Sequence, residues 1–224
     1  MHLVGAASGA VGAGRTYATP TGFVDNITDW ALLKFQEHYG LEMAITKDAI
    51  FAYVYAVLHD PAYRSSYIQD LKRSQPRIPF YADFKQWQDW GERLFELHTG
   101  FVALEPFPFT RTDTPDQRAK AARQSPKPAL RSDRKAGTVA VDSVTKLSGI
   151  PTEAWDYTLA GRPAIDWVLD QHKELAPKDP VVKALFNTYR LADYKEAMID
   201  TLSRVVTVSV KTLQIISQMR PLVH

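Results

Sequence analysis

The sequence predicts a predominantly helical α+β fold with one small β portion. Apolar stripes at helical spacing dominate the first hundred residues, short β-branched segments follow near 102–109 and 137–147, and a long helical pattern closes the chain. The 224 residues are 45% hydrophobic and include no cysteine. This apolar content suffices to bury a core, and the missing cysteine excludes a disulfide framework, a thiolate zinc site and a cysteine nucleophile.

Residues 1–25 are predicted to be a flexible lead-in. They are rich in glycine, alanine and serine and show no helical or strand period. Their glycines resemble a phosphate loop superficially, but no strand precedes them and no Gly-Lys-Ser/Thr ending follows. The start also lacks the basic and apolar regions of a secretory signal, and no stretch of the chain approaches a membrane span of about 20 apolar residues. We therefore expect a cytoplasmic protein without a membrane partner.

Four helices are predicted between residues 26 and 99. Asn26 or Thr28 caps the first, which Gly40 ends, and Thr46 caps the second, with Asp48 in its first turn. The expected apolar stripe of the second helix comprises Ile50, Val54, Val57 and Leu58, widened by Phe51 and Tyr55.

The third helix is expected to open at Pro61 and to run to about Arg73. Residues 77–78 lie between two prolines and should be extended, because a residue before proline avoids the α region. The fourth helix spans residues 83–99 and carries Gly91 as a candidate for close helix packing.

Strands and shorter helices are predicted in the second half of the chain. Residues 102–109 should be an edge strand or extended segment, and residues 137–147 a strand. A short helix should follow Pro151, a turn should lie at residues 161–162, and another helix at 164–174. The closing helix covers about 193–219, although the β-branched run 205–210 makes strand a competing interpretation. Its expected stripe is Met198, Leu202, Val205, Leu213 and Ile216.

Residues 111–135 stand apart by their charge. This segment holds eight basic and three acidic residues, a net +5, whereas the rest of the chain carries −3. It contains three prolines and few large apolar residues, so we predict a long mobile basic loop within a domain of residues 26–219. Such a loop is either a solvated insertion or an arm that binds a polyanion, and charge alone leaves both interpretations open.

Aromatic and basic residues alternate on the predicted helices between residues 53 and 90. Such a pattern can stack on bases and bind phosphates. It is also typical of a seam between helices whose edges basic side chains cover, and the pattern favours that second interpretation. The aromatic residues are Tyr53, Tyr55, Tyr63, Tyr67, Trp87 and Trp90, and the basic ones Arg64, Lys72, Arg73 and Arg77.

No residue pattern indicates catalysis. The six histidines are scattered without metal-ligand spacing, and no Gly-x-Ser-x-Gly elbow is present. Glu92 and Glu96 lie one helical turn apart, as on any exposed helix face. We therefore predict no metal, no cofactor and no reaction for this chain alone.

Several blocks together resemble one protein family, the C-terminal target-recognition domain of type ISP restriction-modification enzymes. The longest is residues 45–64, ITKDAIFAYVYAVLHDPAYR. The others follow in the family's order, so the resemblance covers about residues 26–219. They are DLKR at 70–73, PRIP at 76–79, Phe84, GERLFELH at 91–98, LSGIP at 147–151, AIDWVLD at 164–170 and RVVTVSV at 204–210.

The resemblance implies sequence-specific recognition of double-stranded DNA. Enzymes of that family join a nuclease, a helicase-like ATPase, an adenine-N6 methyltransferase and this domain, and the chain has no Asn-Pro-Pro-Tyr motif or Walker lysine of its own. The methyltransferase and helicase-like portions are therefore implied partners. An alternative is a helical interaction domain that docks on a methyltransferase or motor. The expected DNA contacts are Arg64, Lys72, Arg73, Arg77, Arg118, Lys120, Arg123, Lys127, Arg131, Arg134 and Lys135.

Overall fold

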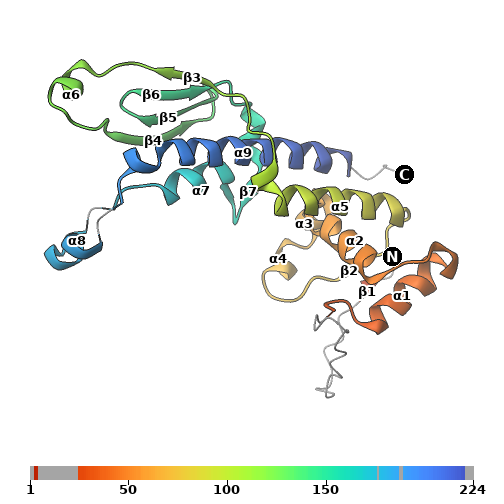
Figure 1. Cartoon of the computed structure of the whole chain (residues 1–224). Coiled ribbons are helices and arrows are strands. Elements are labelled where there is room, and N and C mark those ends of the chain that lie inside the picture. Colours follow the sequence, from red (N-terminus) through yellow and green to blue (C-terminus); the bar gives the residue numbers. More distant parts are fainter. Residues whose placement is uncertain (1–2, 5–24, 176, 187–188, 220–224) are drawn as a thin grey trace. The chain divides into compact units, whose positions relative to one another are not determined.

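The computed structural model describes residues 3–4, 25–175, 177–186 and 189–219 (Figure 1). It confirms the predominantly helical α+β fold with a small sheet and a long closing helix. The chain divides into two compact units, Met1–Thr99 with Ile215–His224 and Gly100–Gln214, called the helical unit and the sheet unit below. No helix in the described part of the chain is long and apolar enough to cross a membrane. The domain boundaries expected from the sequence stay a prediction.

Within the described residues, the helical unit contains five complete helices, one short strand pair and the end of the closing helix, from Ile215 on. The pair joins β1 (Leu3–Val4) and β2 (Ile78–Pro79) in antiparallel fashion, with Val4 opposite Ile78. The remainder of the predicted lead-in lies outside the described residues. The helices are α1 (Asp29–Tyr39), α2 (Lys47–His59), α3 (Pro61–Ser66), α4 (Ile68–Leu71) and α5 (Phe84–Thr99), with the 3-10 turn η1 (Leu41–Met43) after α1.

The helix ends of this unit follow the capping residues that the sequence predicts. The hydroxyls of Thr28 and Thr46 accept hydrogen bonds from the third amide of their helices, each at 3.2 Å. Gly40 ends α1 at a φ of 97°, a region that favours glycine. Pro61 opens α3 as its first residue, behind the buried cap Asp60.

Helices α2 and α5 pack closely because small residues face each other at their crossing. A Cβ atom on Gly91 would lie 1.7 Å from the carbonyl oxygen of Ala52, so only glycine fits. This approach draws the small-residue face of α2 inward, and the predicted stripe is therefore partly wrong. Val54, Leu58 and Tyr55 are only half-buried and Phe51 is 38% exposed. The buried face is Ala49, Ile50, Ala52, Tyr53, Ala56 and Val57.

The predicted third helix is interrupted. It breaks at Tyr67, whose φ of −114° and ψ of 17° separate α3 from α4. Two serines precede this residue, and serine hydroxyls compete with helical hydrogen bonds. The expectation of one helix to Arg73 is therefore wrong, although the extended conformation at Ile78 is confirmed by its place in β2.

The sheet unit carries a four-stranded antiparallel sheet in the order β3-β6-β5-β4. The strands are β3 (Thr110–Asp113), β4 (Pro128–Asp133), β5 (Thr138–Asp142) and β6 (Thr145–Ser148). Shorter elements are η2 (Phe101–Ala103), α6 (Gln117–Ala121), η3 (Thr152–Asp156), and the hairpin strands β7 (Thr158–Leu159) and β8 (Arg162–Pro163). Three further helices are α7 (Ala164–Gln171), α8 (Pro180–Phe186) and α9 (Leu191–Gln218), and α9 belongs to this unit up to Gln214.

The core of this unit lies between one face of the sheet and helices α7 and α9, which Figure 1 shows on the same side of the strands. The predicted stripe of α9 is partly wrong, because Val205 is half-buried whereas its neighbour Val206 is fully buried. Leu213 and Ile216 are likewise half-buried. The central core residues are Val139, Val141, Leu147, Ile165, Leu169, Met198, Leu202 and Val206.

Strands agree only in part with those that the sequence predicts. Of the edge strand or extended segment expected over residues 102–109, the structure has the extended alternative, which begins at Leu104 after η2. Pro106 and Pro108 have no amide hydrogen for a ladder, so no strand forms there. Residues 137–147 hold two strands and the turn between them rather than one. The basic segment 111–135 begins in β3 and runs through β4 into the turn after it, so the prediction of a mobile loop is wrong for the residues of these two strands. Pairing with β6 and β5 supplies the ladder bonds there, and buried Leu130 supplies an apolar anchor.

Candidate nucleic-acid interface

The strand register divides the sheet into two chemically different faces. One row across the strands contains Arg111, Leu147, Val139 and Ser132 in register. Leu147 and Val139 are fully buried, and Ser132 donates a hydrogen bond to Asp166 of α7 at 2.7 Å, so this row faces the helices. The next row, Thr112, Lys146, Ala140 and Arg131, must face the opposite way, because successive side chains alternate.

We call this second surface the open face. Five of its residues are exposed, Ala140 and Ser148 are half-buried, and Thr138 is 9% exposed between its neighbours. None of its side chains is a large apolar one, unlike those of the opposite face. The open face comprises Thr110, Thr112, Arg131, Asp133, Thr138, Ala140, Lys146 and Ser148.

An ionic network on the helix-facing side fixes the sheet to α9. The Nζ atom of Lys195 on α9 lies 2.8 Å from Oδ2 of Asp142 at the end of β5, and the two side chains are only 15% and 5% exposed. Burial acts to raise the pKa of Asp142, but hydrogen bonds from Lys195, Val144 and Thr145 outweigh it and hold that pKa below its usual value.

The edge strand β3 is tied to the same helix. Arg111 makes two hydrogen bonds to Glu196 of α9, at 2.8 and 3.1 Å, and a third to Asp113. The two bonds from Arg111 to Glu196 lower the pKa of that carboxyl below its usual value. Asp113 also accepts a hydrogen bond from the hydroxyl of Thr145. The strands that carry the open face are therefore held in a fixed position on α9.

A β-bulge interrupts the other edge strand, β4. The pairing with β5 shifts between Pro128 and Arg131, and Leu130 adopts a φ of 39°. That conformation costs an L-residue roughly 1–2 kcal/mol. Leu130 is nonetheless buried in the core at 6% exposure, and Arg131, the next residue, lies on the open face. The bulge therefore determines which side chain of β4 reaches each face.

The structure places the predicted cations of the sheet unit on β4 and the connections beside it. Lys120 lies on α6, Arg123 and Lys127 lie between α6 and β4, and Arg134 and Lys135 lie in the turn after β4. All are exposed, as is Arg131. Of these six, only Arg134 forms an ion pair with a carboxylate of the described residues, Asp156 at 2.5 Å. The side chain of Arg118 lies outside the described part.

The predicted cations of the helical unit lie on one connecting region, from α3 to the start of β2. Within the described residues none of them has a carboxylate partner, and all are exposed. They are Arg64 on α3, Lys72 after α4, and Arg73 and Arg77 before β2.

Three of the six aromatic residues, Tyr53, Tyr63 and Trp87, are buried as the favoured interpretation expected, whereas Tyr55, Tyr67 and Trp90 are only half-buried. Tyr53 is fully buried and donates a hydrogen bond to the carbonyl of Pro79 at 2.7 Å. Tyr63 donates to the carbonyl of Arg77 at 2.8 Å, and Trp87 is 9% exposed. Burial raises the pKa of Tyr53 and Tyr63 above the usual value. These rings stabilise the fold and are not available to stack on a base.

Sequence reasoning did not single out Lys146 and Thr112, which the structure places on the open face. The run Thr145, Lys146, Leu147 and Ser148 alternates between the two faces, so its period identifies Lys146 as the residue opposite the core. The alternation is visible in the sequence, but four residues are too few to identify a strand and its exposed face until the neighbouring strand is known.

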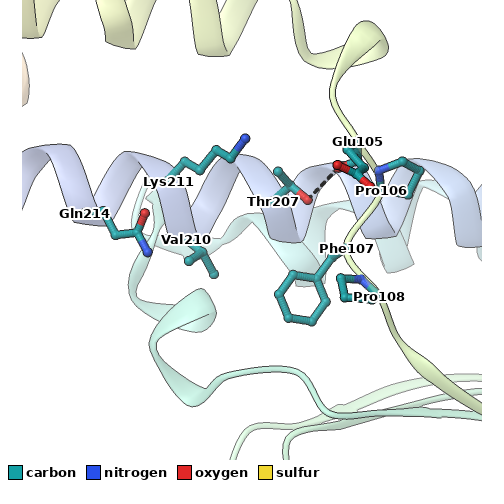
Figure 2. Close-up of a pocket in the computed structure, with 8 residues that line it drawn as sticks. All are labelled: Glu105, Pro106, Phe107, Pro108, Thr207, Val210, Lys211 and Gln214. Carbon is teal, nitrogen blue, oxygen red and sulfur yellow. Dashed lines mark hydrogen bonds between the residues drawn. The ribbon is translucent and has the colours of Figure 1, made fainter.

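The sheet unit also has an open cleft of about 380 Å³ between the extended segment 105–108 and α9 (Figure 2). Thr207, which lines it, donates a hydrogen bond to the carbonyl of Glu105 at 3.0 Å. The other lining residues are Pro106, Phe107, Pro108, Val210, Lys211 and Gln214. They include no grouping of nucleophile and base. No cluster of three metal-ligating side chains occurs among the described residues.

Comparison with known proteins gives one family. The model of the Type ISP C-terminal specificity domain matches residues 9–201, and no curated protein matches the chain. A cryo-EM structure of a DrdV–DNA complex matches with 46% identity and a TM-score of 0.82, over 91% of this chain and 21% of that one.

Two further solved structures match with lower identity. A nuclease-deletion mutant of the Type ISP enzyme LlaGI, in complex with a DNA substrate mimic, shares 28% identity at a TM-score of 0.58, over 78% of this chain and 14% of that one. The DNA-bound enzyme LlaBIII shares the fold, at 21% identity and a TM-score of 0.61, over 84% of this chain and 12% of that one. The chain thus spans about a fifth or less of the proteins it matches. With most of its length covered by the family model, this chain belongs to the Type ISP C-terminal specificity domains.

Proposed function

We propose that the chain recognises specific sequences in double-stranded DNA and catalyses no reaction of its own. The observation that carries the proposal is the group of exposed cations around the open face that have no carboxylate partner in the described part of the chain, in a specificity domain. Its relatives at 46% and 28% identity are described in complexes with DNA and with a DNA substrate mimic.

Two kinds of contact are needed for such recognition. Cations that reach phosphates supply salt-dependent affinity and fix the register of the protein on the duplex. Lys120, Arg123 and Lys127 suit this role, because they lie outside the sheet on exposed connections. Side chains that reach base edges supply the selectivity, and the polar open face offers them.

The chain would act together with the other portions of a restriction-modification system. It spans 21% and 14% of two matched proteins. We therefore infer methyltransferase and helicase-like partners, in the same polypeptide or in a separate subunit. The DNA-binding candidates of the helical unit, Arg64, Lys72, Arg73 and Arg77, would add phosphate contacts.

The proposal is tested by selection from a random duplex pool. The 224-residue chain is incubated with the pool at low salt, bound duplexes are sequenced, and the affinity is measured at several salt concentrations. We expect an enriched sequence and an affinity that falls linearly on a logarithmic salt scale. Binding without enrichment, or no binding at low salt, would contradict the proposal.

A second function, docking on a protein partner, is favoured by exposed apolar side chains around α8. Leu175, Val181 and Leu185 are 75%, 63% and 64% exposed, which is unusual outside an interface. Under this hypothesis Leu185→Ser would abolish co-purification with the methyltransferase portion and leave DNA affinity unchanged.

A further inference from the structure

The open face differs from the cationic connections beside it. Its central row contains Thr112, Lys146, Ala140 and Arg131 on four adjacent strands. The side chain of Ala140 is short, so the longer side chains of Arg131 and Lys146 on either side of it extend further from the sheet than the middle of the row does. The remaining side chains are hydroxyls and one carboxylate. The face therefore presents hydrogen-bond donors and acceptors rather than uniform positive charge.

One residue argues against simple phosphate binding on this face. Asp133 lies two residues after Arg131 on the same strand, is exposed, and accepts a hydrogen bond from the amide of Ala136 at 3.0 Å. A fixed carboxylate repels phosphate but can accept a hydrogen bond from a base amino group. The mixture of charges suits base edges in a groove better than a phosphate backbone.

The bulge in β4 is an independent observation that points to Arg131. Leu130 holds a left-handed φ of 39°, and the shift in pairing brings Arg131 directly opposite Ala140. Bulges that redirect a side chain are common beside functional sites. Arg131 is exposed and forms no ion pair with a described carboxylate, so its guanidinium remains available to a ligand.

The spacing of the two cations can be compared with that of base pairs. Arg131 and Lys146 lie on β4 and β6 with β5 between them, which is two strand spacings. Strands are about 4.8 Å apart, so the two positions are separated by roughly 10 Å. Base pairs rise by about 3.4 Å, so this separation corresponds to about three base-pair steps.

We propose that Arg131 and Lys146 determine specificity by reading two guanines about three base pairs apart in the major groove. Arginine and lysine are suited to the O6 and N7 acceptors of guanine. The inference rests on the proposed function and assigns the selective part of that function to the row centred on Ala140.

The test compares the consensus selected by the wild-type chain with those selected by Arg131→Ala and Lys146→Ala. Each variant should lose discrimination at one guanine, by roughly 5- to 100-fold, and the two affected positions should lie about three base pairs apart. Arg131→Lys and Lys146→Arg should restore part of the preference. The exposed Lys178, in the connection before α8, provides the matched control, and Lys178→Ala should select the wild-type consensus.

The outcomes separate the two proposals. Selective binding by the wild-type chain, with a consensus that neither alanine variant changes, overturns this inference and leaves the proposed function intact. A uniform loss of affinity at all positions assigns the two residues to phosphates and also overturns it. Absence of any wild-type selectivity overturns the proposed function itself. Unchanged unfolding midpoints for the variants, expected because both side chains are exposed, show that folding is not the cause.

Discussion

The helical unit and the sheet unit place polar and aromatic groups beside their cations in opposite ways. In the helical unit the companions of the cations are rings such as Tyr53 and Trp87, which are buried. In the sheet unit the companions are three threonines and Ser148 of the open face, of which Thr110 and Thr112 are exposed and Ser148 is half-buried. Both regions expose arginine and lysine, but only the second exposes the chemistry that could distinguish one base pair from another.

This difference teaches that a pattern of alternating residue types does not identify a binding surface by itself. Whether such residues can bind a ligand depends on the direction in which their side chains point, and that direction is set by how the helices and strands pack. The close approach of α5 to Ala52 turns Tyr53 inward, whereas the register of β5 and β6 turns Lys146 outward. The following predictions test these two packing arrangements.

The largest effect is expected for Gly91→Val in the helical unit. Even a Cβ atom there would lie 1.7 Å from a backbone oxygen, which no side-chain rotation can relieve. We expect a loss of more than about 4 kcal/mol in the free energy of unfolding, above the range typical of overpacking. Urea denaturation measures it. Glu92→Val, on the exposed side of the same helix, should cost about 0.5 kcal/mol, and equal stabilities of the two variants would contradict the packing described.

A smaller loss is expected for Lys195→Met in the sheet unit. The substitution leaves Asp142, only 5% exposed, without its ion-pair partner. Removing one member of a buried pair costs about 3 kcal/mol or more. Lys173→Met, which removes an exposed partner of Asp170, should cost less than about 1 kcal/mol. Thermal unfolding of both variants checks the difference, and a neutral Lys195→Met would show that α9 does not fix the sheet in this way.

The next effect concerns the affinity for DNA. Alanine at Lys120, Arg123 and Lys127 should make the logarithmic salt slope shallower by about 0.9 for each phosphate that is no longer neutralised, and should leave the selected sequence unchanged. Alanine at Arg64, Arg73 and Arg77 gives the matched variant of the helical unit. Binding titrations at several salt concentrations measure the slope. An altered consensus sequence in either triple variant would show that residues outside the open face contact the bases.

The smallest effect is a pH dependence of the helical unit. Burial, with His59 as a neighbouring group, lowers the pKa of His98 to about 4, so the fold favours the neutral ring. The contribution of the neutral His98 ring to the free energy of unfolding is fully present above about pH 6.5 and is lost as the pH falls toward 4. Because the ring is partly exposed, we expect a loss on the order of 1 kcal/mol. Unfolding midpoints between pH 7 and 4 should fall less for His98→Gln than for the wild-type chain.

The sequence was sufficient to predict the helices whose ends carry capping residues. Thr28, Thr46 and Pro61 act within one turn of their own position, so local chemistry determines them. The strand β3 could not be predicted, because its ladder bonds come from β6, which is distant in sequence. The strand β4 pairs with its neighbour β5 across a short turn, but its prolines and charged residues hide the strand pattern. The bulge at Leu130 likewise depends on its pairing with β5 and its burial in the core, whereas the two serines before Tyr67 are a local signal for the break between α3 and α4.

The candidate site was predictable in composition but not in arrangement. The excess charge of residues 111–135 identified most of its cations, including Arg131. The pairing of Arg131 with Ala140 and Lys146 joins three strands, and no spacing along the chain reveals it. Lys146 lies outside the basic segment, so only the sheet register brings it into the site.

Protection of a single cysteine tests the central claim, that DNA lies against the open face, most directly. The chain has no cysteine, so Thr112→Cys places a single thiol on that face, and Ala197→Cys places a single thiol at an exposed position of α9. Alkylation of both is followed with and without saturating selected duplex. The account predicts that bound DNA slows alkylation at position 112 and leaves position 197 unchanged. Equal alkylation rates at position 112 with and without DNA would contradict it.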